Sequence, residues 1–139
     1  MQLSRFVAAL ASMSALLLGA ACKEKDSTSP TALHVPGNYR ATTFTTTTAA
    51  GTQNILEAGG SVTAQFDPSG DVRGHVTIPE QSVNTNFAGT WKLKKTTVRL
   101  DPISSGILID TLPYNVSGNS LVADTTLGGT RVRLVLVKQ

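Results

Sequence analysis

Apolar and polar residues alternate with a period of two along much of the chain. In the first clear example, residues 62–78, the apolar residues Val62, Ala64, Phe66, Val72, Val76 and Ile78 all lie at even-numbered positions. Such alternation is typical of β-strands with one buried and one solvated face. The stretch Asp67-Pro68-Ser69-Gly70-Asp71 contains a proline that presets φ and a glycine that tolerates positive φ, so we predict a β-hairpin here.

The same pattern recurs along the rest of the chain. Alternation is found in residues 90–94, 97–101, 112–116, 121–123 and 131–136, and the threonine-rich residues 39–47 and then residues 53–57 complete the set of expected strands. Threonine is β-branched and favours extended backbone. After Cys22, no segment has apolar residues at helical spacing over ten positions. The pattern therefore predicts an all-β domain of about eight to ten short strands with almost no helix.

The order of the turns indicates how these strands are arranged. Short strands joined by tight local turns must hide the edges of their sheet, by closing the sheet or by packing it on a second one. A chain of consecutive hairpins favours an antiparallel up-and-down β-barrel. The alternative is a β-sandwich, which needs a long crossing connection, for which residues 101–109 are the candidate.

The start of the chain has a different character. Residues 6–18 carry no charge, follow a short basic start and precede three small residues. This composition is typical of a signal peptide, and the apolar run is shorter than the roughly 20 residues of a membrane-spanning helix. We predict a cleaved signal-peptide helix in residues 1–21, a flexible tether in residues 22–36 and one β-domain in residues 37–139. The tether is expected because too few apolar residues lie there to form a core.

Cys22 is the only cysteine of the chain and follows Gly19-Ala20-Ala21. The stretch LLLGAAC resembles the signal of bacterial lipoproteins, in which this cysteine is acylated with fatty acids such as palmitate and becomes the first mature residue. The resemblance implies a lipid anchor at Cys22 in the cell envelope, and Lys23 after it favours the outer membrane, facing the periplasm. The alternative is ordinary secretion with the same cleavage and a free thiol.

Three stretches of the domain, GSVTAQFDPSGDVRGHVTI, FAGTWKLKKTTVRL and YNVSGNSLVAD, resemble the small lipocalin-like domains of bacterial lipoproteins. The resemblance implies a barrel that encloses a small apolar or amphiphilic ligand. Phe66, Trp91 and Tyr114 lie at inward positions of three strands and are the candidate ligand-binding residues. Alternatively these side chains only fill the barrel, since eight strands leave just enough room for side chains.

The domain contains few candidate catalytic residues. His75 is its one histidine and is expected on the solvent face of its strand. Asp67 and Asp71 flank the predicted turn, and the formation of this turn accounts for their presence without a binding role. A nucleophilic serine needs a base within reach, and a metal site needs several ligands. We therefore expect no enzymatic activity, no metal and no cofactor.

Charge gives a weaker indication of partners. From residue 22 onward the chain has 11 basic and 9 acidic side chains. Alternation places Lys92 with Lys94, and Arg131 with Arg133, on single faces of their strands, so the four form a cationic stripe if those strands adjoin. The expected targets of such a stripe are anionic lipid headgroups or envelope polymers rather than nucleic acid. The alternative is a solvated face that discourages edge pairing.

Two functions follow from these features. The first is a lipid-anchored, non-enzymatic envelope protein whose barrel binds an apolar or amphiphilic ligand. The second is a structural or protein-interaction module of the cell envelope with no small-molecule ligand. In both cases we expect a monomer that contacts the membrane through its N-terminal lipid.

Overall fold

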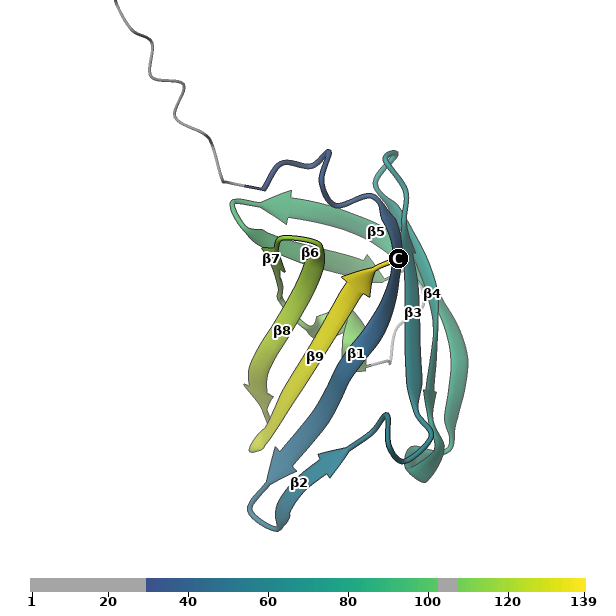
Figure 1. Cartoon of the computed structure of the whole chain (residues 1–139), viewed down its shortest axis with the longest axis vertical. Coiled ribbons are helices and arrows are strands. Elements are labelled where there is room, and N and C mark those ends of the chain that lie inside the picture. The colour runs from purple at the N-terminus through teal and green to yellow at the C-terminus, as the bar shows by residue number, and fades with distance from the viewer. Residues whose placement is uncertain (1–29, 103–107) are drawn as a thin grey trace, which may run out of the picture.

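The barrel predicted from the alternation is present. The computed structural model describes residues 30–102 and 108–139, and their strands form one antiparallel sheet that closes into an eight-stranded barrel with a short additional strand (Figure 1). The strands are β1 (Gly37–Thr48), β2 (Gly51–Asn54), β3 (Ser61–Phe66), β4 (Asp71–Ile78), β5 (Val83–Lys94), β6 (Thr97–Pro102), β7 (Tyr114–Ser117), β8 (Ser120–Leu127) and β9 (Thr130–Lys138). Two single 3₁₀ turns, η1 (Pro79–Gln81) and η2 (Leu108–Thr111), are the helical segments of the described residues. The alternative of a β-sandwich is thereby excluded.

Strand β1 closes the barrel because both of its edges are paired. Along one edge its first residues pair with β3 and its last residues with β2, and along the other edge it pairs with β9. Every other neighbour in the barrel is the next strand along the chain, apart from β2. This up-and-down order is the one that consecutive tight turns predicted. Closure removes the free edges that an open sheet would expose to other chains.

The hairpin of β3 and β4 was predicted correctly. Phe66 pairs with Val72, and the amide of Gly70 donates to the carbonyl of Asp67 at 3.0 Å. Gly70 has a φ of +97°, a conformation that glycine adopts without the strain that a side chain would add. The side chain of Gln65 donates to Asp67 at 3.1 Å and holds the turn from the side.

A β-bulge in β1 changes which residues face the core. Ala41 pairs with Leu136 and Thr43 with Val135, so Thr42 is an extra residue in this strand. Before the bulge Tyr39 and Ala41 are buried, and after it the buried residue is Phe44. The alternation therefore shifts by one position, as expected where two residues oppose one.

Several strand limits differ from the prediction. β5 begins at Val83 and not near residue 90, because the polar residues Asn84, Thr85 and Asn86 pair with β4 although they show no alternation. β2 ends at Asn54, and residues 55–59 form turns instead of the predicted strand through residue 57. The strand predicted at residues 112–116 is β7, which starts at Tyr114.

The core also includes a residue that was assigned to the tether. Val35 is fully buried, and its carbonyl accepts a hydrogen bond from the Tyr39 hydroxyl at 2.7 Å. The packed domain therefore begins before the predicted boundary at residue 37. Among the described residues the buried cluster runs from Val35 to Leu136, and all of it lies within a chain that starts at residue 22. Cys22, the predicted signal peptide and the tether up to residue 29 lie outside the described residues.

Candidate functional site

The aromatic residues predicted to bind a ligand are buried among other side chains. The exposed fractions are 2% for Phe66, 6% for Trp91 and 1% for Tyr114. Phe66 packs edge-on against Tyr39 with ring centroids 5.3 Å apart, and edge-on against Trp91 with centroids 6.1 Å apart. This geometry is favourable for aromatic pairs. The structure thus brings Phe66 and Trp91 together in one aromatic row, with Tyr39 as its third member.

Trp91 is also fixed by hydrogen bonds to the β3–β4 turn. Its indole Nε1 donates to the carbonyl of Asp67 at 2.9 Å, and its amide donates to the carbonyl of Gly70 at 2.8 Å. A buried indole N–H needs such a partner. Both ends of the turn are therefore held on β5, and the indole has no free donor for a ligand.

Tyr114 lies apart from this row, next to η2. Its hydroxyl donates to the carbonyl of Ile109 at 2.7 Å. Burial raises the pKa of Tyr114 above its ordinary range, and the carboxylate of Asp110 acts in the same direction. The Tyr114 hydroxyl is consequently a neutral hydrogen-bond donor in the core and is not a candidate acid or base.

Asp110 is the one buried charged residue among the described residues, and its Oδ2 has no hydrogen-bond partner. Burial raises the pKa of this carboxyl group above its ordinary value of 3.8. The folded state therefore binds the proton more tightly than the unfolded state does. The contribution of this group to stability is then highest below pH 3.8 and is lost as the pH rises through the pKa of the folded state.

We predict that Asp110→Asn stabilises the barrel at neutral pH by about 1 kcal/mol, because it replaces a buried carboxylate by a neutral amide. The gain should vanish below about pH 3, where the wild-type carboxyl is protonated in both states. Urea unfolding at several pH values measures this difference. Asp124→Asn is the control of opposite sign, because hydrogen bonds from Arg131 lower the pKa of Asp124. A gain for Asp110→Asn that does not depend on pH would contradict the prediction.

The three predicted aromatic side chains do not line the main hollows of the described residues. Four hollows, with volumes from about 210 to about 620 Å³, are lined by residues other than Phe66, Trp91 and Tyr114. The largest crosses the outer faces of β1, β3, β4 and β5. Its lining includes two cross-strand rows, Arg40–Thr63–His75–Asn86 and Asn38–Gln65–Arg73–Ala88.

The polar groups of this outer hollow are held in place by one another. Gln65 accepts a hydrogen bond from the Nε of Arg73 at 3.0 Å while donating to Asp67. His75, on the outer face as predicted, has its Nδ1 2.8 Å from Asn86 Oδ1 and its Nε2 3.2 Å from the hydroxyl of Thr77. Fixed donors of this kind suit a polar or anionic partner. The sequence did not indicate this site, because it depends on the register of four strands.

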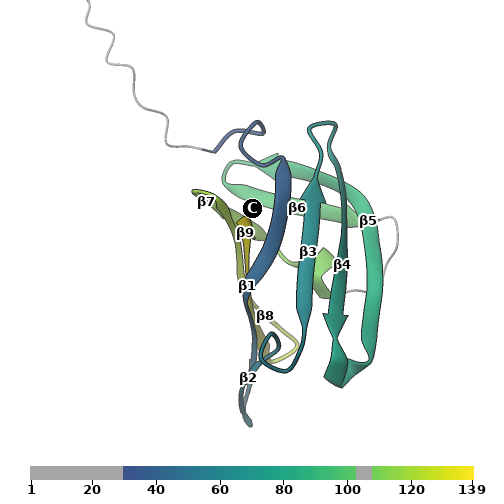
Figure 2. The ribbon, with the colours of Figure 1, turned by 45° about the vertical axis from the view of Figure 1, so that its right-hand side comes forward.

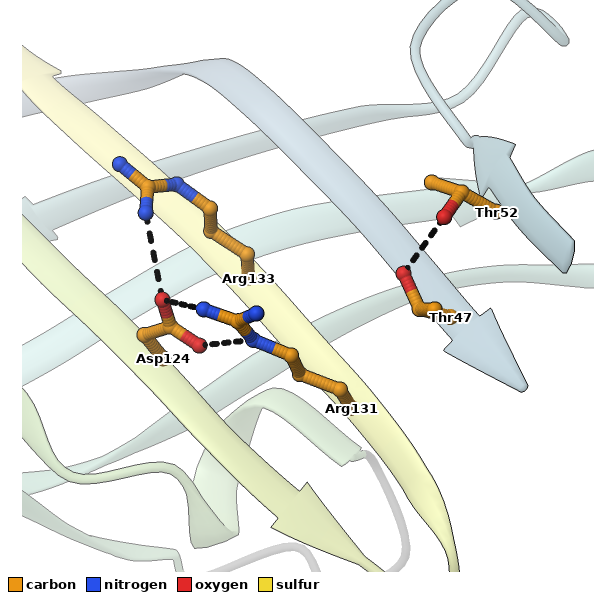
Figure 3. A network of polar contacts seen from close by, with 5 residues as sticks. All are labelled: Thr47, Thr52, Asp124, Arg131 and Arg133. Carbon is orange, nitrogen blue, oxygen red and sulfur yellow. Dashed lines mark hydrogen bonds and ion pairs between the residues drawn. The ribbon is translucent and has the colours of Figure 1, made fainter. Parts of the chain in front are cut away.

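The predicted cationic stripe does not form across β5 and β9, because these strands are not neighbours in the sheet. On β9, Arg131 and Arg133 flank Asp124 of β8 (Figure 3), with shortest ion-pair distances of 2.8 and 3.2 Å. On β5, Lys92 lies directly opposite Arg99 of β6. The basic residues thus form two separate groups, of which the β9 group is neutralised in part.

Neither a metal site nor a membrane-spanning helix is found among the described residues. Within residues 30–102 and 108–139, no three His, Cys, Asp or Glu side chains are grouped closely enough to hold a metal ion. The described part of the chain contains no helix with the length and apolarity needed to cross a bilayer. Comparisons with protein-family models, with curated proteins and with solved structures gave no significant match.

Proposed function

We propose that this chain is a lipid-anchored, non-enzymatic protein of the cell envelope whose barrel acts as an interaction module through its outer surface. The observation that carries the proposal is the filled interior. The aromatic side chains expected to line a cavity are packed in the core, and the polar atoms of Trp91 and Tyr114 are bonded to backbone carbonyls. A small barrel filled by its own side chains has no room for an enclosed ligand.

The outer surface, unlike the filled interior, has a hollow that is large enough for a partner. The hollow across β1, β3, β4 and β5 has a volume of about 620 Å³, within the range of known ligand pockets. Arg40 and Arg73 supply charge there, and the Gln65 and Asn86 amides supply directed hydrogen bonds. Such groups suit the polar or anionic part of a partner, while much of the remaining lining is apolar.

The anchor is tested by Cys22→Ser in a bacterial host that processes lipoproteins. Acyl chains contribute about 0.8 kcal/mol for each buried methylene, so two or three chains hold a protein on a membrane almost permanently. We expect the wild-type chain in the membrane fraction and Cys22→Ser in the soluble fraction. Ser29→Ala is the matched control and should stay with the membrane. A wild-type chain whose N-terminal peptide carries no fatty acid by mass spectrometry would contradict the proposal.

The filled interior is tested with palmitate as the probe. Trp91 is the only tryptophan, so its fluorescence reports directly on the interior of the barrel. We expect no change in its emission during titration of the chain from residue 22, carrying Cys22→Ser, with palmitate below its critical micelle concentration. Saturable quenching at a stoichiometry of one would instead support a ligand enclosed by the barrel.

A further inference from the structure

The β5–β6 hairpin carries a group of basic side chains on its outer face. Lys92 lies opposite Arg99, Lys94 lies opposite Thr97, and Lys95 is in the turn between the strands with a φ of +58°. All four basic side chains are exposed. The ion pairs of the described residues involve Asp124, Arg131 and Arg133 only, so none of the four is neutralised in this way. We call Lys92, Lys94, Lys95 and Arg99 the hairpin cluster.

The acidic residues nearest to the hairpin cluster in the sheet lie on one side of it. Thr90 of β5 pairs with Asp71 of β4 and with Asp101 of β6, further from the hairpin turn than Lys92 and Arg99. The outer face of the hairpin is therefore acidic toward its base and basic toward its tip. At the tip, Lys94, Lys95, Thr96, Thr97 and Arg99 line a hollow of about 310 Å³.

The tip of the hairpin lies where the chain enters the barrel. Figures 1 and 2 both show the end of β5 and the start of β6 beside the segment that leads into β1. This segment is bound to the barrel, because Lys138 Nζ donates to the carbonyl of His34 at 2.6 Å and Val35 is buried. The chain between Cys22 and Pro30 spans at most about 29 Å when fully extended. An anchor at Cys22 therefore keeps this end of the barrel close to the bilayer.

We infer that the hairpin cluster is the surface by which the barrel rests on an anionic membrane. The inference deepens the proposed function and rests on it for the position of the membrane. An anionic membrane is the expected partner because of the charge and the position of the hairpin cluster. Its four cations form no ion pair with any described residue, and they lie at the tethered end of the barrel, where they can face a layer of anionic headgroups. The hollow between Lys94 and Arg99 admits a phosphate group, with the hydroxyl of Thr96 as a further donor, while the Thr97 hydroxyl donates to Asn115 at 3.0 Å. Contact of this kind would fix the orientation of the barrel relative to the bilayer.

The test measures binding of the unacylated domain to vesicles. The chain from residue 22, with Cys22→Ser, is mixed with vesicles of phosphatidylcholine and phosphatidylglycerol in equal parts, and bound protein is measured by sedimentation. We expect binding that is absent with pure phosphatidylcholine and weakens steeply with salt. Lys94→Gln with Lys95→Gln should reduce the affinity by about 25-fold, since each cation near an anionic leaflet contributes about 1 kcal/mol, or about fivefold.

The control removes the same charge from another place. Arg131→Gln with Arg133→Gln neutralises two cations of β9 and should reduce binding by less than about threefold, because these cations already share Asp124. Equal losses for the two double variants would overturn the inference, because binding would then follow net charge alone. Tight binding to soluble dextran sulfate without binding to vesicles would overturn it in favour of an anionic polymer. These results do not depend on acylation, which mass spectrometry of Cys22 tests separately.

Discussion

Replacing Gly74 by alanine is expected to destabilise the barrel by about 3 kcal/mol, near the upper end of the usual cost of overpacking. Gly74 lies in the middle of β4, between Ala64 of β3 and Phe87 of β5. A Cβ atom at this position would overlap with the carbonyl oxygen of Thr63 and with the ring of Phe87. The carbonyl belongs to the sheet backbone and cannot rotate away, and overpacking of this kind costs roughly 1–3 kcal/mol or more. Urea unfolding followed by the emission of Trp91 measures the loss as a lower midpoint with an unchanged slope.

Two further variants separate this overlap from a general effect of losing a glycine. Gly118 has a φ of +56° and open space around the position that an alanine Cβ would occupy, so Gly118→Ala should cost only the backbone strain, about 1 kcal/mol. Combining Gly74→Ala with Phe87→Leu should cost less than the sum of the two single changes, because the shorter side chain removes part of the overlap. Strict additivity would show that Phe87 does not limit the space above Gly74.

The architecture could be predicted from the sequence because alternation reports burial directly. In β3, β4 and β9 every second residue faces a continuous core, so the pattern of Val62, Val76 and Leu134 identified both the strands and their inward faces. The turn at Asp67–Asp71 had an equally direct signal in its proline and glycine. The same alternation placed Phe66, Trp91 and Tyr114 correctly inside the barrel.

Other features had no local signal. Thr42 forms the bulge of β1, but threonine is found on both faces of a sheet and its neighbours include further threonines, so the shift of phase could not be located. Asn84, Thr85 and Asn86 form strand through pairing with β4, although none of them is buried. Val35 is buried by contacts that depend on how the chain enters the barrel. In each case long-range packing decides the structure.

The candidate sites were the least predictable part. The outer hollow depends on a register that brings Arg40, Thr63, His75 and Asn86 into one row from four strands. The hairpin cluster depends on β5 and β6 reaching the end of the barrel at which the chain enters. Alternation identified which face each basic residue takes, but it could not show that β5 and β9 are separated in the sheet.

Replacing Trp91 by alanine should cost about 3–5 kcal/mol, the usual loss for a large aromatic side chain of a packed core. The indole contacts Phe66, and its Nε1 donates to the carbonyl of Asp67, so the change leaves a void and removes one of the two hydrogen bonds to that carbonyl. Thermal unfolding followed by circular dichroism is the suitable measurement, because this variant has no tryptophan. A loss of 1 kcal/mol corresponds to about 4–8 °C in a domain of this size, so the transition should move by more than about 10 °C.

Trp91→Phe isolates the hydrogen bond from the packing. The phenyl ring keeps the contact with Phe66 but cannot donate to Asp67, so we expect a smaller loss of about 1–2 kcal/mol. The pair of variants also bears on function. A side chain that lines an open ligand cavity can be truncated at little cost, because the space already exists and no packed neighbours are lost. A cost below about 1 kcal/mol for Trp91→Ala would therefore favour an enclosed ligand, whereas a large cost supports action through the outer surface.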